Sequence, residues 1–178
     1  MNSRVDFQEL LANGATLQQA LELFDSLEPI TVDEMLGKWK GSGFPTGHHM
    51  DGLLENFSWW GKEFGSAEDV HPLVFDGSNR HYVLDPRWMP LKYARNTALS
   101  VNPVARWIFR TLLPVLQTSQ SRARLRMLEH RGVVSAAMVY DEKPINDVFR
   151  KIDDDTLLGL MDLKRSSKPF FFILKRVR

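Results

Sequence analysis

The residues of this 178-residue chain that could do chemistry gather in its last third, where polar and apolar side chains alternate. In "SRARLRML" every second residue is an arginine, so these side chains share one face of a β-strand. Guanidinium, ammonium and phenol groups in such strands can bind a phosphate or carboxylate through charge-assisted hydrogen bonds. The candidate anion-binding residues are Arg124, Arg126, Tyr140, Arg150 and Lys164, with Asp162 among them as a balancing charge.

The same alternation also fits strands with one ordinary solvated face, because polar outer faces are the rule in antiparallel sheets. The two interpretations differ in which face points inward, and a shift of one residue exchanges the faces. Arg150 shares a face with Val148, and Asp162 shares a face with Leu160, which favours interior positions for both charges. Charged groups are rarely buried unless they are paired or bind a ligand.

The stretch "MLGKWKGSGFPTGHH" (residues 35–49) contains glycines and a histidine pair that suggest a phosphate loop or a metal site. Its glycines do not match G-x-x-x-x-G-K-[ST], and the chain has no H-E-x-x-H spacing. We therefore predict neither metal nor cofactor, although a haem or metal site remains an alternative because distant histidines can converge. For His48 we expect a polar contact near a cavity mouth, or a role in capping the segment that follows.

Composition excludes several functions. The chain has no cysteine, which rules out disulfides, thiolate catalysis and cysteine-type zinc sites. A formal net charge of +1 gives no general attraction to nucleic acid, and we predict no nucleic-acid binding. The start of the chain lacks a signal-peptide pattern, and no long apolar run predicts a transmembrane helix. We expect a cytoplasmic protein, and the sequence leaves its oligomeric state open.

The elements that position these residues begin with helices. Capping boxes predict helices over 16–27 and 31–36, and an apolar face predicts a third helix over 50–64. Two short strands around "DGSN" predict a hairpin over 71–86. A strongly apolar helix is predicted over 97–118, with prolines near both of its ends.

The last third of the chain has the period of β-strands. Five segments separated by short connectors predict an antiparallel meander over 121–177. The predicted fold class is mainly β, or α+β by content. We expect a helical extension over 1–30 and a single domain over 31–178, made of a first part (32–94), the mid-chain helix (97–118) and the meander.

Residues 37–41 spell Gly-Lys-Trp-Lys-Gly, directly after the second capped helix. This G-x-W-x-G sequence resembles the opening of lipocalin-type barrels, in which the tryptophan plugs the closed end and a basic residue of the last strand stacks on it. The resemblance implies that Trp39 is the plug and Arg176 its partner, with Lys175 and Arg178 as alternates. Such a stack is worth roughly 0.5–2 kcal/mol.

The resemblance extends over about residues 32–176. The stretch from "MLGKWKGSGFPTGH" to "HPLVFDG" is similar to the bacterial and fungal family named for its GXWXG motif. The stretch from "ARLRMLEHRG" to "PFFFILKR" is similar to the uncharacterised domain that normally follows. The resemblance implies a small lipocalin-like antiparallel β-barrel, mostly without assigned activity, whose best-supported role is binding a lipid, in the first place a phospholipid.

A barrel can enclose a cavity, and the aromatic residues of this chain could line it. The candidates for contacts with acyl chains are Trp59, Trp60, Trp88, Trp107, Phe109 and Phe172. The segment 103–116 combines apolar residues with two arginines, which is typical of a portal lid or of a helix that touches a membrane surface transiently. The alternative is a buried helix that closes one end of the barrel.

We therefore expect non-enzymatic binding of a lipid, or another hydrophobic small molecule with an acidic headgroup, in the cavity of a barrel. The alternatives are a haem- or metal-binding barrel and an enzyme acting on a hydrophobic molecule. The chain has residues for acid–base work but no recognisable nucleophile–base arrangement, so we predict no catalytic residues.

Overall fold

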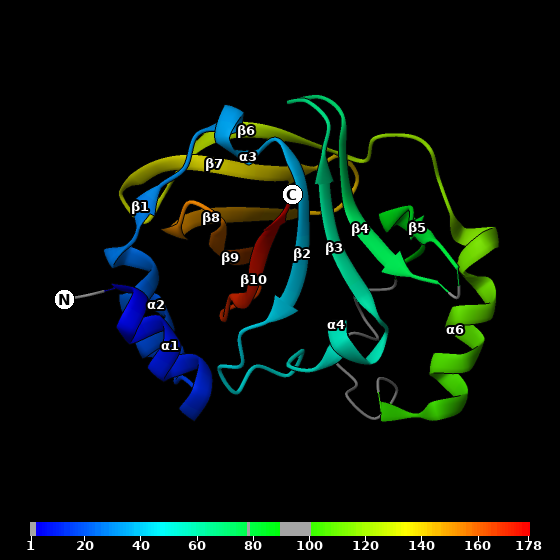
Figure 1. Cartoon of the computed structure of the whole chain (residues 1–178), viewed down its shortest axis with the longest axis horizontal. Coiled ribbons are helices and arrows are strands. Elements are labelled where there is room, and N and C mark those ends of the chain that lie inside the picture. The colour runs from blue at the N-terminus through cyan, green and yellow to red at the C-terminus, as the bar shows by residue number, and fades with distance from the viewer. Residues whose placement is uncertain (1–2, 78, 90–100) are drawn as a thin grey trace.

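The computed structural model describes residues 3–77, 79–89 and 101–178 (Figure 1). The helices are α1 (Ser3–Asn13), α2 (Leu17–Ser26), α3 (Val32–Met35), α4 (Leu53–Asn56) and α6 (Pro103–Leu116), with a 3-10 turn η1 (Pro86–Trp88). The strands are β1 (Glu28–Pro29), β2 (Gly37–Gly43), β3 (Trp59–Phe64), β4 (Val70–Asp76), β5 (His81–Val83), β6 (Ala123–His130), β7 (Val133–Tyr140), β8 (Ile145–Asp153), β9 (Thr156–Leu163) and β10 (Phe170–Val177).

The strands form one antiparallel sheet that returns on itself. Its order runs β8-β7-β6-β4-β3-β2-β10-β9, and β9 pairs again with β8, so the order describes a ring. The join between β4 and β6 is the shortest, with the single register pair Val70 and Ala123. The Ser121 hydroxyl reinforces this join because it accepts a hydrogen bond from the Val70 N–H at 3.0 Å. The ring therefore has an inner and an outer face.

Apolar side chains cover both faces of strands β8 to β10. The inner face carries Phe149 and Phe172, which belong to the core inside the ring. The outer face carries Phe171, whose ring packs edge-on against Phe24 of α2 at 6.1 Å. Figure 1 shows α1 and α2 beside this part of the ring and α6 on the opposite side of the molecule. The N-terminal helices thus give these strands a second buried face.

The G-x-W-x-G motif closes one part of the ring. Trp39 is 0% exposed, and its Nε1 donates a hydrogen bond to the Met35 carbonyl at 2.7 Å. Arg176 lies directly opposite Trp39 in the register of β2 and β10, with its guanidinium carbon 4.1 Å from the centre of the indole. Lys175 and Arg178, the alternates, have exposed side chains, and Arg176 makes the stack.

Most predicted elements are present. The capping boxes at Thr16 and Thr31 begin α2 and α3, β4 and β5 form the expected hairpin, and five strands occupy the predicted meander. The predicted apolar helix corresponds to α6, while the part of that prediction over 97–100 lies outside the described residues. No helix of the described residues is long and apolar enough to cross a membrane.

The predicted helix over 50–64 is wrong, because only α4 and strand β3 form there. Ser58 adopts a φ of 59° and Gly61 a φ of 150°, and neither value continues a helix. A side chain on Gly61 would meet the Trp39 carbonyl oxygen at 2.0 Å, so glycine allows β3 to approach β2. The pairing of β3 with β4 is irregular at Gly61, and this irregularity changes which side chains face inward.

Candidate functional site

A cavity of about 480 Å³ lies among the ring strands, α4, η1 and α6. Among the described residues its walls are overwhelmingly apolar, and four of the lining side chains there carry a polar group other than an indole N–H. The lining residues are Met50, Leu53, Leu54, Phe57, Trp59, Lys62, Leu73, Phe75, Leu84, Pro86, Trp88, Met89, Ala105, Phe109, Leu116, Tyr140, Lys143, Ile145, Asp147, Met161, Phe170 and Phe172. This volume and composition are those of sites for small hydrophobic molecules.

Helix α6 supplies one wall of the cavity. Phe109 points inward, and its ring lies edge-on to Phe57 at 4.9 Å and to Phe75 at 5.2 Å. The other side of the same helix is an apolar surface without a partner among the described residues. Its exposed side chains are Val104, Trp107, Ile108, Leu112 and Val115. The helix is thus apolar on both sides, and the described residues cover its inner side alone.

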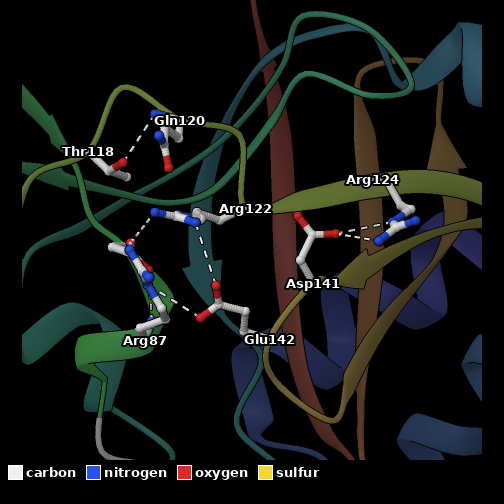
Figure 2. A network of polar contacts seen from close by, with 8 residues as sticks. Arg87, Thr118, Gln120, Arg122, Arg124, Asp141 and Glu142 are labelled. Atoms are coloured by element: carbon white, nitrogen blue, oxygen red, sulfur yellow. Dashed lines mark hydrogen bonds and ion pairs between the residues drawn. The ribbon is translucent and has the colours of Figure 1, made fainter.

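An ion-pair network fixes the wall formed by η1, where Figure 2 shows Arg87 and Arg122 reaching the same neighbours. Both arginines pair with the buried Asp85 carboxylate, at 2.7 Å and 2.8 Å, and with Glu142. Burial acts to raise the pKa of Asp85, but hydrogen bonds from Arg87 and the charge of Arg122 lower it overall. Asp85 also accepts from the Arg87 N–H and so caps η1.

Lys143 ties the loop after β7 to the same wall. Its Nζ donates to the Arg87 carbonyl at 3.3 Å and to the Met89 carbonyl at 3.2 Å. Lys143 lines the cavity beside Trp88, which is itself largely exposed. These two residues therefore mark the side of the cavity nearest to solvent.

An ion pair is buried inside the cavity wall. Lys62 of β3 and Asp147 of β8 are 3% and 2% exposed, and the Nζ of Lys62 lies 2.8 Å from Oδ2 of Asp147. The same Nζ donates to the Pro72 carbonyl at 3.2 Å. Burial raises the pKa of Asp147 above its ordinary value, although the charge and hydrogen bond of Lys62 oppose this rise. The mainly apolar lining given by the described residues thus contains a directly paired cation and anion.

Aromatic groups surround this ion pair. The Lys62 Nζ lies 5.0 Å from the ring centre of Phe172, 5.5 Å from that of Trp59 and 5.8 Å from that of Tyr140. Burial, and then the negative charge of Asp147, raise the pKa of the Tyr140 hydroxyl well above its ordinary value. Tyr140 therefore stays protonated and is a hydrogen-bond donor at neutral pH.

Among the predicted binding residues, Tyr140 and Phe109 line this cavity, as do three further aromatic candidates, Trp59, Trp88 and Phe172. Arg124 and Arg126 lie on the outer face of β6 and pair with Asp141 at 2.8 Å and Glu68 at 2.6 Å (Figure 2 draws the first pair). Of the two alternatives that the sequence leaves open for these arginines, the structure has the solvated outer face, because Ala123 and Leu125 of the opposite parity face the core.

Arg150, Asp162 and Lys164 are also absent from the cavity lining. Arg150 is buried outside the ring, where its guanidinium lies 5.0 Å from the Phe24 ring and donates to the His130 and Val133 carbonyls. Asp162 shares this outer parity, and Lys164 is exposed beyond the end of β9. The inward prediction fails because α1 and α2 make the outer face of these strands apolar.

His48, Trp60 and Trp107 lie near the cavity but do not line it. His48 is buried, its Nδ1 accepts from the Met50 N–H at 3.2 Å, and its backbone N–H donates to Asp51. Burial, and then the charge of His49, lower the pKa of His48. Trp60 packs on His81 at 4.5 Å, and Trp107 is 68% exposed on the outer side of α6.

Within the described ranges, no three histidine, aspartate or glutamate side chains gather as metal ligands would. The principal polar groups of the cavity, Lys62 and Asp147, were not among the predicted site residues. Lys62 was hidden by the incorrect helix prediction over 50–64. Asp147 had a usable signal, since it alternates with Ile145 and Phe149 on the inner face of β8.

Comparison with known proteins agrees with this architecture. Residues 22–79 match the family described as GXWXG protein, and residues 121–176 match a domain of unknown function, DUF4334. No curated protein matches the chain. A crystal structure of a protein from Thermomonospora curvata is similar over 100% of both chains, at 30% sequence identity and a TM-score of 0.72. The chain therefore belongs to the GXWXG family and carries the DUF4334 domain in its C-terminal part.

Proposed function

We propose that this protein binds a lipid or a similar hydrophobic small molecule, without catalysis, in the cavity of a lipocalin-like barrel. The observation that carries the proposal is the cavity of about 480 Å³ with its nearly continuous apolar wall. Each methylene transferred from water to such a wall contributes about 0.8 kcal/mol, so an acyl chain of moderate length supplies enough free energy for binding.

The closed strand order and the Trp39 plug support the comparison with lipocalin-like barrels. The ring returns from β9 to β8, and the Arg176 guanidinium stacks on Trp39 next to the start of β2. The cavity lies elsewhere in the ring, since neither Trp39 nor Arg176 lines it. In a barrel of this kind the plugged end keeps the strands together while the cavity accepts the ligand.

The sequence predicts that arginines inside the ring bind an acidic headgroup, and we propose a different position for this headgroup. Arg124 and Arg126 are paired on the outer face, and Arg150 is covered by α2, so these cations do not support a headgroup site inside the ring. Lys143 is the cavity-lining cation on the solvent side. We place the acidic headgroup of a phospholipid there, where it stays in contact with water and its apolar chain extends inward.

Helix α6 is the proposed entry element, and it would contact a membrane surface transiently. It contributes Phe109 to the cavity wall, and it exposes Trp107 and Val115 on the other side. Arg106 and Arg110 lie on the same helix, where they can approach anionic headgroups. A ligand leaving a bilayer would meet the exposed apolar side first and reach the cavity when the helix moves.

The test is to extract and identify, by mass spectrometry, the small molecules that remain bound to purified protein. We expect a lipid in stoichiometric amount from the parent, and less from Met161→Trp, which places a bulkier side chain in the cavity. Met127→Trp is the matched control, because Met127 is an exposed methionine that does not line the cavity. An empty parent that also fails to take up lipid from vesicles would overturn the proposal.

One observation favours an enzymatic alternative. Asp147 is a buried carboxylate in an apolar cavity with a raised pKa, and it lies near Tyr140, a neutral hydrogen-bond donor. Such a pair is suited to moving a proton on an apolar substrate. Deuterium exchange at the α-carbon of apolar ketones, catalysed in D₂O by the parent but not by Asp147→Asn, would support this alternative. Exchange at the uncatalysed rate would exclude it for that substrate class.

A further inference from the structure

Three of the four polar side chains among the described cavity-lining residues lie together, around the Lys62–Asp147 ion pair, and Lys143 lies apart from them on the solvent side. Lys62 has three protons on Nζ, and two of them are directed to Asp147 Oδ2 and the Pro72 carbonyl. The other oxygen of the carboxylate, Oδ1, is buried and has no hydrogen-bond partner among the described residues. An acceptor in this state is unusual, because buried charged groups are normally fully paired.

Two donors next to the ion pair are also unpaired within the described part of the chain. The Nε1 of Trp59 is buried without a hydrogen-bond partner, and the Tyr140 hydroxyl makes no hydrogen bond. Both residues line the cavity, and both rings lie within 5.8 Å of the Lys62 Nζ. The place therefore offers one charged acceptor and neutral donors that nothing in this part of the chain uses.

Their charges restrict what can bind there. The ion pair sums to zero, so a ligand carboxylate would face the Asp147 carboxylate, and a ligand ammonium group would face Lys62. A ligand carboxylate or a ligand ammonium group would therefore add an uncompensated charge at a buried position. A hydroxyl group is uncharged, donates one hydrogen bond and accepts two, which complements an acceptor flanked by donors.

We propose that Asp147, Tyr140 and Lys62 form a recognition site for an uncharged hydroxyl group at the inner end of the ligand. The hydroxyl donates to Asp147 and accepts from Tyr140, with the remaining Lys62 proton or the Trp59 N–H as a second donor. This inference rests on the proposed binding function and adds the chemical class of the ligand: an apolar molecule with a hydroxyl group on the part that enters the cavity.

The test compares two probes of similar length, dodecan-1-ol and 1-methoxyundecane, which differ in the hydroxyl proton. Their dissociation constants are measured by displacement of a fluorescent apolar reporter from the full-length protein. Because a hydrogen bond to a charged group is among the strong ones, we expect the parent to bind the alcohol about tenfold or more tightly than the ether.

Two variants connect this preference to the site. In the double variant Lys62→Met/Asp147→Leu, residues of similar size replace the ion pair, and we expect tight ether binding without preference for the alcohol. Tyr140→Phe removes a donor to the ligand oxygen, which alcohols and ethers can both use as acceptors, so it should weaken binding of both probes and leave the preference for the alcohol, which depends on Asp147. The matched control is Lys38→Met/Glu63→Leu, which removes an ion pair outside the cavity lining and should keep the full preference.

The possible results distinguish hydroxyl recognition from binding of an apolar molecule in the cavity. Equal binding of alcohol and ether by the parent would overturn hydroxyl recognition and leave cavity binding intact, as expected where a water molecule satisfies these groups. A preference that survives in Lys62→Met/Asp147→Leu would also overturn the recognition site, and unchanged binding of both probes by Tyr140→Phe would overturn the role of Tyr140 in it. Failure of the parent to bind either probe would overturn hydroxyl recognition and the proposed binding function together.

Discussion

The guanidinium carbon of Arg176 lies 4.1 Å from the centre of the Trp39 indole, although the two residues are 137 positions apart in sequence. They are register partners across β10 and β2. The same guanidinium donates to the carbonyls of Glu34 and Leu36, at 2.6 Å and 2.9 Å, while the indole donates to Met35. This contact joins the last strand, the first long strand and the C-terminal end of α3.

Arg176→Ala should lower the free energy of unfolding by about 2–3 kcal/mol, because it removes the stack and two charge-assisted hydrogen bonds. Arg176→Lys should recover only part of this loss, since a lysine cannot reach both carbonyls with a planar fork. Urea denaturation measures the difference. Arg178→Ala is the control, because Arg178 is exposed and pairs only with Asp155, and we expect a loss under about 0.5 kcal/mol. An equal loss at Arg176 and Arg178 would contradict the role of the stack.

Gly61→Ala should be severely destabilising, by more than about 4 kcal/mol, because the new Cβ meets backbone that cannot move aside. The Trp39 carbonyl oxygen would lie 2.0 Å from it. Gly132→Ala serves as the control, since Gly132 also has positive φ but has open space around its Cβ position. We expect the control to lose only about 1 kcal/mol, the cost of the strained backbone. Soluble yield and the urea midpoint distinguish the two variants.

Local sequence signals account for most of the fold. Capping boxes located α2 and α3, and alternation located strands β6 to β10, because these signals depend on residues that are close in sequence. The segment from Trp59 to Phe64 forms a strand and not the predicted helix, because its apolar spacing fits a helix as well as an irregular strand. The close approach of β2 to Gly61 favours the strand over the helix. This contact joins residues from two different strands, so the local spacing of apolar residues does not predict it.

The site was harder to predict because it depends on which face of each strand is inner. Arg150 has apolar neighbours at positions i−2 and i+2, as an inner residue would, yet those neighbours pack under the N-terminal helices. Asp147 lies on the inner face of β8, and this position could be predicted because Asp147 alternates with the apolar Phe149 on the same face. The partner of Asp147 is Lys62, 85 positions away, and no single-sequence pattern joins the two.

Lys62→Met should destabilise the protein by about 3–5 kcal/mol near neutral pH, because it leaves the Asp147 carboxylate buried and unpaired. The loss should be smaller near pH 4. Burial raises the pKa of Asp147, and loss of Lys62 raises this pKa further, so the folded state increasingly favours the protonated carboxyl. A carboxyl group with a raised pKa in the folded state costs stability as the pH rises above its ordinary value near 3.8.

The control for this prediction is the double variant Lys62→Met/Asp147→Leu. It contains no buried charge, and we expect it to recover most of the stability at neutral pH and to lose the extra pH dependence. Urea denaturation of the three proteins between pH 4 and pH 8 gives the comparison. A loss in Lys62→Met that is the same at both ends of this range would show that the ion pair is not the cause.

Glu34→Gln should remove part of the acid sensitivity of the protein. Hydrogen bonds from Lys151 and Thr31 lower the pKa of Glu34 to about 2, so its stabilising effect is present above about pH 4.5 and is lost as the pH falls toward 2. Glutamine keeps the capping box but loses the pair with Lys151. The carboxylate is partly exposed, so we expect a loss below about 1 kcal/mol at pH 7. A difference between parent and variant that persists at pH 2 would contradict this assignment.

The outer side of α6 should bind membranes through its exposed apolar residues. Trp107→Ser/Val115→Ser removes the two most exposed of these side chains without touching the cavity wall. Burial of a large apolar side chain in the interface is worth about 1.5–3 kcal/mol, so the double variant should bind vesicles at least about tenfold more weakly than the parent. Co-sedimentation with anionic vesicles measures this, and added salt should weaken the binding because Arg106 and Arg110 contribute electrostatic attraction. Val134→Ser, an exposed residue on β7, is the control and should bind as the parent does. If the α6 variant also binds as the parent does, the apolar side of α6 does not contact the bilayer.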